Sequence, residues 1–121
     1  MSPEKAVVFF VEDDDDSREV STEFLEMSGH HVVDTARSLE EALTKIPNLD
    51  KKGVNVAVVD GNLSEWDASG RDGERVAKEI KNQHPNIVVI GHALSEPIAA
   101  ADVNCTKFEG SSKLAETVTS A

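Results

Sequence analysis

Acidic residues follow two apolar segments of this chain, and their positions suggest chemistry with a cation or a phosphoryl group. Five consecutive acids, Glu12 to Asp16, come directly after the apolar run 6–11, and Asp60 comes directly after the largely apolar run 54–59. If both runs are neighbouring strands of a parallel sheet, the first acids and Asp60 meet at one edge. Converging carboxylates repel one another and raise a pKa unless a cation joins them. Oxygen ligands of this kind suit Mg²⁺.

Each of these residues also has an alternative interpretation. A run of acids, here residues 14–16 above all, can be a solvated surface or a helix N-terminus, where the dipole favours negative charge. Asp60 can be a helix cap or a turn residue. It can also be a nucleophile, because a carboxylate forms an acyl phosphate once positive charge neutralises the transferring oxygens. Lys107, which follows the last predicted strand, can supply such charge or be a solvated lysine.

The segments that must position these residues alternate between strand and helix patterns. In the first helix, Val20, Phe24 and Met27 fall on one stripe, and Ser38 begins the second helix with capping-box spacing to Glu41. Short connections between such elements require right-handed crossovers. They predict a doubly wound, five-stranded parallel sheet with helices on both faces, and ligand sites beyond the carboxyl ends of the strands. The predicted strands are 6–11, 31–33, 54–59, 87–90 and 103–106, and the predicted helices are 17–28, 38–46, about 73–84 and 112–119, with one or two helical turns at 97–101.

Length and composition restrict the class of protein. With 121 residues, 39% of them apolar, we expect one domain over residues 1–121, and the start at Met1 and finish at Ala121 favour a whole protein. A net charge of −11 opposes binding to nucleic acid or to an anionic membrane surface, and no apolar run is long enough to span a membrane. One cysteine, Cys105, excludes an internal disulfide. The expectation is a cytoplasmic protein. His92, near the predicted ligand edge, is interpreted as an ordinary core-edge or solvent histidine.

Taken together, these residues resemble the receiver domain of two-component response regulators over nearly the whole chain. The family's fold, a flavodoxin-like five-stranded parallel sheet, agrees with the fold predicted from the elements. The matching pieces, in chain order, are Val11-Glu12-Asp13-Asp14 followed by Arg18, then Val58-Val59-Asp60, Asp72-Gly73, Ala101-Asp102 and Thr106-Lys107.

The resemblance implies a role for each matching residue. Glu12 and Asp13 resemble the acidic pair that binds Mg²⁺, and Asp60 resembles the phosphoacceptor, which also contacts the metal. Asn62 occupies the position whose backbone carbonyl is a further metal ligand, and Lys107 resembles the lysine that contacts the phosphoryl group. An aspartyl phosphatase, the enzymatic alternative, would need an acid at position 62.

The function implied is that of a stand-alone receiver in two-component or phosphorelay signal transduction. It would accept a phosphoryl group on Asp60 from a histidine kinase or a histidine phosphotransfer protein, and would signal through contacts with a downstream protein target. It would not be an enzyme beyond catalysing its own phosphotransfer and dephosphorylation. The added charge of about −1.5 to −2 would act as a local electrostatic switch.

Three positions and one segment depart from the family's pattern. Ala93 stands where a Ser or Thr normally ends the fourth strand, with Ser95 as the alternative for that position. Asn104 replaces an aromatic residue, Phe108 replaces a proline, and residues 95–102 are too few for a normal fourth helix, which is therefore expected to be short or missing. These departures favour an alternative function: a pseudo-receiver interaction domain that does not switch on phosphorylation.

Overall fold

The computed structural model describes residues 6–60, 71–93, 97–106 and 110–120. They form five strands and four α-helices, with one short 3₁₀ helix after α2. The strands are β1 (Val7–Val11), β2 (His31–Ala36), β3 (Val56–Asp60), β4 (Val88–Ala93) and β5 (Val103–Thr106). The helices are α1 (Asp15–Met27), α2 (Leu39–Lys45), η1 (Ile46–Asn48), α3 (Arg71–Gln83) and α4 (Gly110–Ser120).

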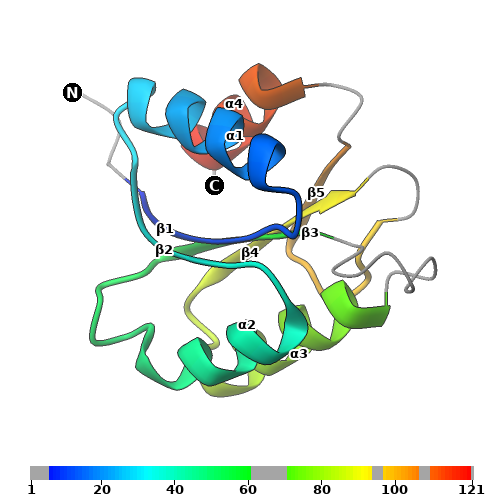
Figure 1. The fold of residues 1–121 in the computed structure, drawn as a ribbon. Helices are drawn as coiled ribbons and strands as arrows, with labels where there is room; N and C mark the ends of the chain where they lie inside the picture. Colours follow the sequence, from blue (N-terminus) through cyan, green and yellow to red (C-terminus); the bar gives the residue numbers. More distant parts are fainter. Residues whose placement is uncertain (1–5, 61–70, 94–96, 107–109, 121) are drawn as a thin grey trace.

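The five strands form one parallel sheet in the order β2-β1-β3-β4-β5. Helices α1 and α4 lie on one face of the sheet, and α2 and α3 lie on the other (Figure 1). Each face has its own buried cluster, because alternate residues of a strand point to opposite faces. Phe9, Val59 and Ile80 belong to the α2–α3 side, whereas Phe10, Val58 and Leu114 belong to the α1–α4 side. The predicted fold class, a doubly wound parallel sheet of flavodoxin-like topology, is confirmed.

Local signals in the sequence account for several element boundaries. The side chain of Asp14 accepts a hydrogen bond from the backbone N–H of Ser17 and so caps α1. Ser38 caps α2 in the same way, accepting from the N–H of Glu41, as the capping-box spacing predicts. Gly29, just beyond α1, has a φ of 92°, a backbone conformation that favours glycine.

The stripe noted in α1 does not face the sheet. Val20, Phe24 and Met27 are exposed, with 82% of the Met27 surface accessible, whereas Ser21 and Leu25 are buried. Leu25 packs into the core on the α1–α4 side, and Ser21 is buried on the same helix. The apolar stripe of α1 is therefore a surface feature.

The connection from β4 to β5 contains no helix in its described part, residues 97–102, which we call the strap. Ile98 of the strap is 3% exposed and packs into the α2–α3 core. The side chain of Asn104 accepts a hydrogen bond from the Ile98 N–H at 2.9 Å and donates one to the Ile98 carbonyl at 3.1 Å. At the other end of the strap, Asp102 accepts from the Val89 N–H and from the Lys81 ammonium. The expectation of a short or missing fourth helix is confirmed. Of the one or two helical turns predicted at 97–101, the structure has a single hydrogen-bonded turn, in which the N–H of Ala101 donates to the carbonyl of Ile98 at 3.1 Å.

Two polar clusters join distant parts of the chain. Nδ1 of His30 accepts from the backbone N–H of Ala6 at 3.0 Å, and Nε2 lies 2.9 Å from Thr119 Oγ1 on α4. Asp34 on β2 pairs with Lys45 of α2 at 2.9 Å and also with Lys52. None of the helices in the described residues combines the length and apolar content needed to cross a membrane.

Candidate functional site

Two neighbouring strands deliver the acidic residues to one edge of the sheet. Asp60 is the last residue of β3, and Glu12 and Asp13 directly follow β1. Val11 and Val59 are partners in the register of these strands, so the residues after them lie side by side. All five residues of β3 are buried, because the sheet is covered on both faces. A buried apolar strand therefore fixes the position of the Asp60 backbone.

The same register determines which side chains share a face. Phe10, Val58 and Ile90 form a row across three strands on the α1–α4 side. Two residues further along the chain stand Glu12, Asp60 and His92: Asp60 and His92 lie in β3 and β4, and Glu12 directly follows β1. Because every second residue of a strand returns to the same face, these three continue that row toward the carboxyl edge.

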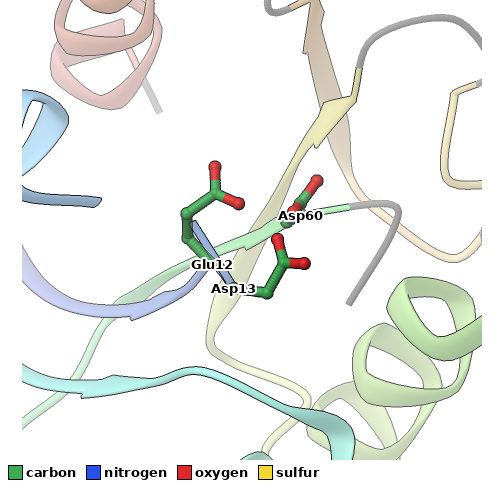
Figure 2. Close-up of side chains that lie close together, drawn as sticks. All are labelled: Glu12, Asp13 and Asp60. Carbon is green, nitrogen blue, oxygen red and sulfur yellow. The ribbon is translucent and has the colours of Figure 1, made fainter. Parts of the chain in front are cut away.

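Three carboxylates gather at this edge, from Glu12, Asp13 and Asp60 (Figure 2). One oxygen of each lies within 4.8 Å of the corresponding oxygens of the other two. Glu12 is 1% exposed and Asp60 is 3% exposed, whereas Asp13 is exposed to solvent. The cluster therefore has two buried members and one open side.

The electrostatics of the cluster favour a cation. Burial raises the pKa of Asp13 above its ordinary value of 3.8, and the neighbouring Glu12 carboxylate raises it further, although a hydrogen bond with Asp60 offsets part of the rise. A hard divalent cation relieves this repulsion, and carboxylate oxygens are its preferred ligands. The spacing of the carboxylates, their oxygen ligands and the raised pKa of Asp13 all fit a Mg²⁺ site.

Backbone and side-chain hydrogen bonds hold the turn between β1 and α1. The N–H of Glu12 donates to the carbonyl of Ala36 on β2 at 2.9 Å. The carbonyl of Glu12 accepts from Nη1 of Arg18, on the first turns of α1, at 3.0 Å. Asp14 and Asp15 take ordinary helical roles, since Asp14 caps α1 and Asp15 pairs with Arg18. This agrees with the alternative interpretation offered for the later acids of the run.

Several predicted site residues cannot be placed next to this cluster. Asn62, Ser95 and Lys107 lie outside the described residues, as does Phe108. Ala93 ends β4 one residue beyond His92, which is the register partner of Asp60. Thr106 pairs with Ala93, so Lys107 directly follows a strand that ends at the same edge. The predicted roles of these residues stay predictions.

His92 lies at the acidic edge, where the sequence predicts only an ordinary core-edge or solvent histidine. It is buried, with 5% of its surface exposed, and it pairs in register with Asp60. The interpretation as a core-edge histidine is compatible with this position, but the residue belongs to the row that contains Glu12 and Asp60. The sequence already indicates a position near the ligand edge for His92, and extending the predicted fourth strand from Ile90 to Ala93 adds its pairing with Asp60.

Comparisons with known proteins agree on the architecture. The family profile described as response regulator receiver domain matches residues 8–108. No curated protein matches the chain. Among solved structures, a CheY-like receiver domain protein from Methanospirillum hungatei JF-1 is 20% identical with a TM-score of 0.77, covering 97% of this chain and 93% of that one.

Two further structures have similar scores. The response regulator domain of Thermotoga maritima CheB is 20% identical with a TM-score of 0.77, covering 98% of this chain and 96% of that one. The signal receiver domain of the putative response regulator NarL from Mycobacterium tuberculosis is 20% identical with a TM-score of 0.76, covering 98% and 96%. At this level of identity, the structural likeness establishes the fold.

Proposed function

Because this chain belongs to the response regulator receiver domain family, we propose that Asp60 accepts a phosphoryl group from a histidine kinase or a histidine phosphotransfer protein. Receiver domains are signalling domains and not classical enzymes, so the proposed product is a phosphorylated state of the protein. The observation that carries the proposal is the cluster of Glu12, Asp13 and Asp60 at the carboxyl edge of β1 and β3.

The proposed reaction has two steps. A carboxylate oxygen of Asp60 attacks the phosphorus of a phosphohistidine, the new P–O bond forms, the P–N bond breaks, and the partner's histidine leaves with the electron pair. In the second step, water attacks the phosphorus of the acyl phosphate, the P–O bond to Asp60 breaks, and inorganic phosphate and the free carboxylate result. The burial of Asp60 supports its role as the acceptor, since its carboxylate has a fixed position at the strand end.

Glu12, Asp13, Asp60 and the backbone carbonyl of Asn62 are the proposed ligands of Mg²⁺, and Lys107 is the proposed contact of the phosphoryl oxygens. When bound, Mg²⁺ supplies positive charge that stabilises the transferring oxygens. The carboxylates of Glu12 and Asp13 orient the site around Asp60. In this proposal Lys107, which directly follows β5 in the sequence, adds a second positive charge.

The test is direct phosphorylation of the purified chain. We expect that Mg²⁺ and a small phosphodonor, such as phosphoramidate, add one phosphoryl group, visible by intact-mass spectrometry. Asp60→Asn should abolish the adduct. Asp50→Asn changes an exposed acid outside the cluster and should keep the adduct. A folded wild-type protein that gains no phosphoryl mass with any donor would contradict the proposal.

A specific observation favours a second candidate, the pseudo-receiver that binds a protein partner without switching. Asn104 replaces the family's aromatic residue. Both polar atoms of its side-chain amide form hydrogen bonds with the backbone of Ile98. Beryllofluoride, a phosphoryl mimic, separates the two candidates. Amide chemical-shift changes that extend through β5 and the strap support switching, and changes confined to the acidic edge support the pseudo-receiver.

A further inference from the structure

Arg18 makes a contact with the acidic edge that its place in the sequence motif does not explain. Its Nη1 donates to the backbone carbonyl of Glu12 at 3.0 Å, and its Nη2 pairs with the carboxylate of Asp15. The side chain is 17% exposed, so the guanidinium is largely enclosed between α1 and the turn. A long, entropically costly side chain is therefore held in one orientation by two bonds.

The carbonyl that Arg18 binds belongs to the peptide bond joining Glu12 to Asp13. A peptide unit is planar, so a bond at this oxygen restrains the backbone of both residues. The preceding peptide unit is restrained as well, because the N–H of Glu12 donates to Ala36 on β2. Arg18 and Ala36 of β2 therefore restrain the peptide units on either side of Glu12. Of these two contacts, only that of Arg18 restrains the peptide unit that Glu12 shares with Asp13.

The charge of Arg18 acts in the opposite direction to its hydrogen bond. A cation beside a metal site repels an incoming divalent cation, so the charge alone weakens Mg²⁺ binding. The hydrogen bond strengthens binding, because ligands that are held in position need no ordering when the ion arrives. The two effects therefore predict opposite outcomes when the guanidinium is removed.

We propose that Arg18 is a positioning residue: by holding the peptide unit between Glu12 and Asp13, it strengthens Mg²⁺ binding in spite of its positive charge. This inference rests on the proposed function of the carboxylate cluster as a Mg²⁺ site. It assigns to Arg18 no contact with the metal or with the phosphoryl group.

The test is a titration with MgCl₂ at constant ionic strength, followed by the amide resonances of the acidic edge. We expect Arg18→Gln to raise the Kd for Mg²⁺ about tenfold, the lower end of the effect of removing a residue that orients a metal ligand. Arg18→Lys keeps the charge and can donate one bond, so its Kd should lie between those of the wild type and the Gln variant. Arg18→Met fills the same space without a donor and serves if the Gln variant does not fold.

The matched control is Arg37→Gln, which removes an equal charge from an exposed arginine directly after β2, at the same sheet edge. It should leave the Kd unchanged or lower it slightly. A Kd for folded Arg18→Gln equal to or below that of the wild type would overturn the positioning role and leave the proposed function standing. Absence of saturable Mg²⁺ binding by the wild type would instead remove the proposed metal site, and this inference with it.

Discussion

Gly91 and Asn104 form a pair whose energetics can be worked out from the structure. They are register partners on β4 and β5. A methyl group added at Gly91 would lie 2.2 Å from Asn104 Oδ1 and 3.2 Å from the Cβ of Ile98. The first distance is far below van der Waals contact, so the Asn104 side chain must leave its position. Gly91→Ala should therefore break both hydrogen bonds between Asn104 and Ile98.

The expected magnitudes follow from these contacts. Asn104→Ala removes two hydrogen bonds and should lower the free energy of unfolding by about 1.5 kcal/mol. Gly91→Ala loses the same bonds and adds crowding, for a total of about 2.5 kcal/mol. In the double variant the two hydrogen bonds are lost only once and the crowding of the new methyl group against the Cβ of Ile98 remains, so the total cost should again be about 2.5 kcal/mol. The coupling between the two sites is then about 1.5 kcal/mol.

Urea unfolding of the four proteins, followed by circular dichroism at fixed pH, measures this cycle. The m-values should agree among the variants, so that midpoints report stability. Asn86→Ala, an exposed asparagine in the turn before β4, provides the control background, where the effects should add. Additivity of Gly91→Ala and Asn104→Ala to within about 0.5 kcal/mol would refute the reasoning, because it would mean that Asn104 does not occupy the space beside Gly91.

Three further predictions concern ionisable groups. Asp13→Asn should raise the Tm of the metal-free protein by about 1–3 °C at neutral pH; calorimetry should show the difference growing as the pH rises above 3.8, since the raised pKa of Asp13 makes its ionisation unfavourable. Burial lowers the pKa of His30 below 6.5, so its stabilising contribution is present above pH 6.5 and lost as the pH falls through the lowered pKa; urea midpoints of the wild type should therefore fall with acidification more steeply than those of His30→Gln. Burial raises the pKa of Asp34, but the bonds from Lys52 and Lys45 outweigh it and leave the pKa below 3.8. Asp34→Asn should cost about 2 kcal/mol at pH 7 in urea unfolding, and the cost should disappear as acid protonates Asp34 in the wild type below pH 3.8; a constant cost would contradict this assignment.

The fold could be predicted because its strands have strong signals. Sheets covered on both faces need continuous apolar strands, and the runs that end at Val11 and Val59 have this character. The same runs place their following acids at the carboxyl edge, so the meeting of Glu12, Asp13 and Asp60 could be predicted once the two runs are taken as neighbouring strands. The fold and the position of the acids both follow from the direction and pairing of the strands, which the alternation of strand and helix patterns indicates.

Features that depend on close packing could not be predicted. In α1, apolar residues occupy two sectors of the helix, and periodicity does not reveal that Leu25 faces the core while Val20 and Phe24 face solvent. The neighbouring elements decide which sector is buried, and in α1 that sector contains the polar Ser21 as well as Leu25. The close contact of Gly91 with Asn104 depends on the exact distance between residues on different strands, and no local sequence pattern predicts it.

The short connection between β4 and β5, which includes the strap, also affects the cost of assembling the sheet. Nine residues, 94–102, separate β4 from β5, whereas 27 residues, 61–87, separate β3 from β4. Loop-closure entropy grows with the logarithm of length, so joining β5 costs about 1 kcal/mol less than joining β4. β5 has four residues and a single pairing neighbour, so it gains the least from strand pairing. The shortest connection between consecutive strands therefore leads to β5, the strand whose pairing can offset the least loop-closure entropy.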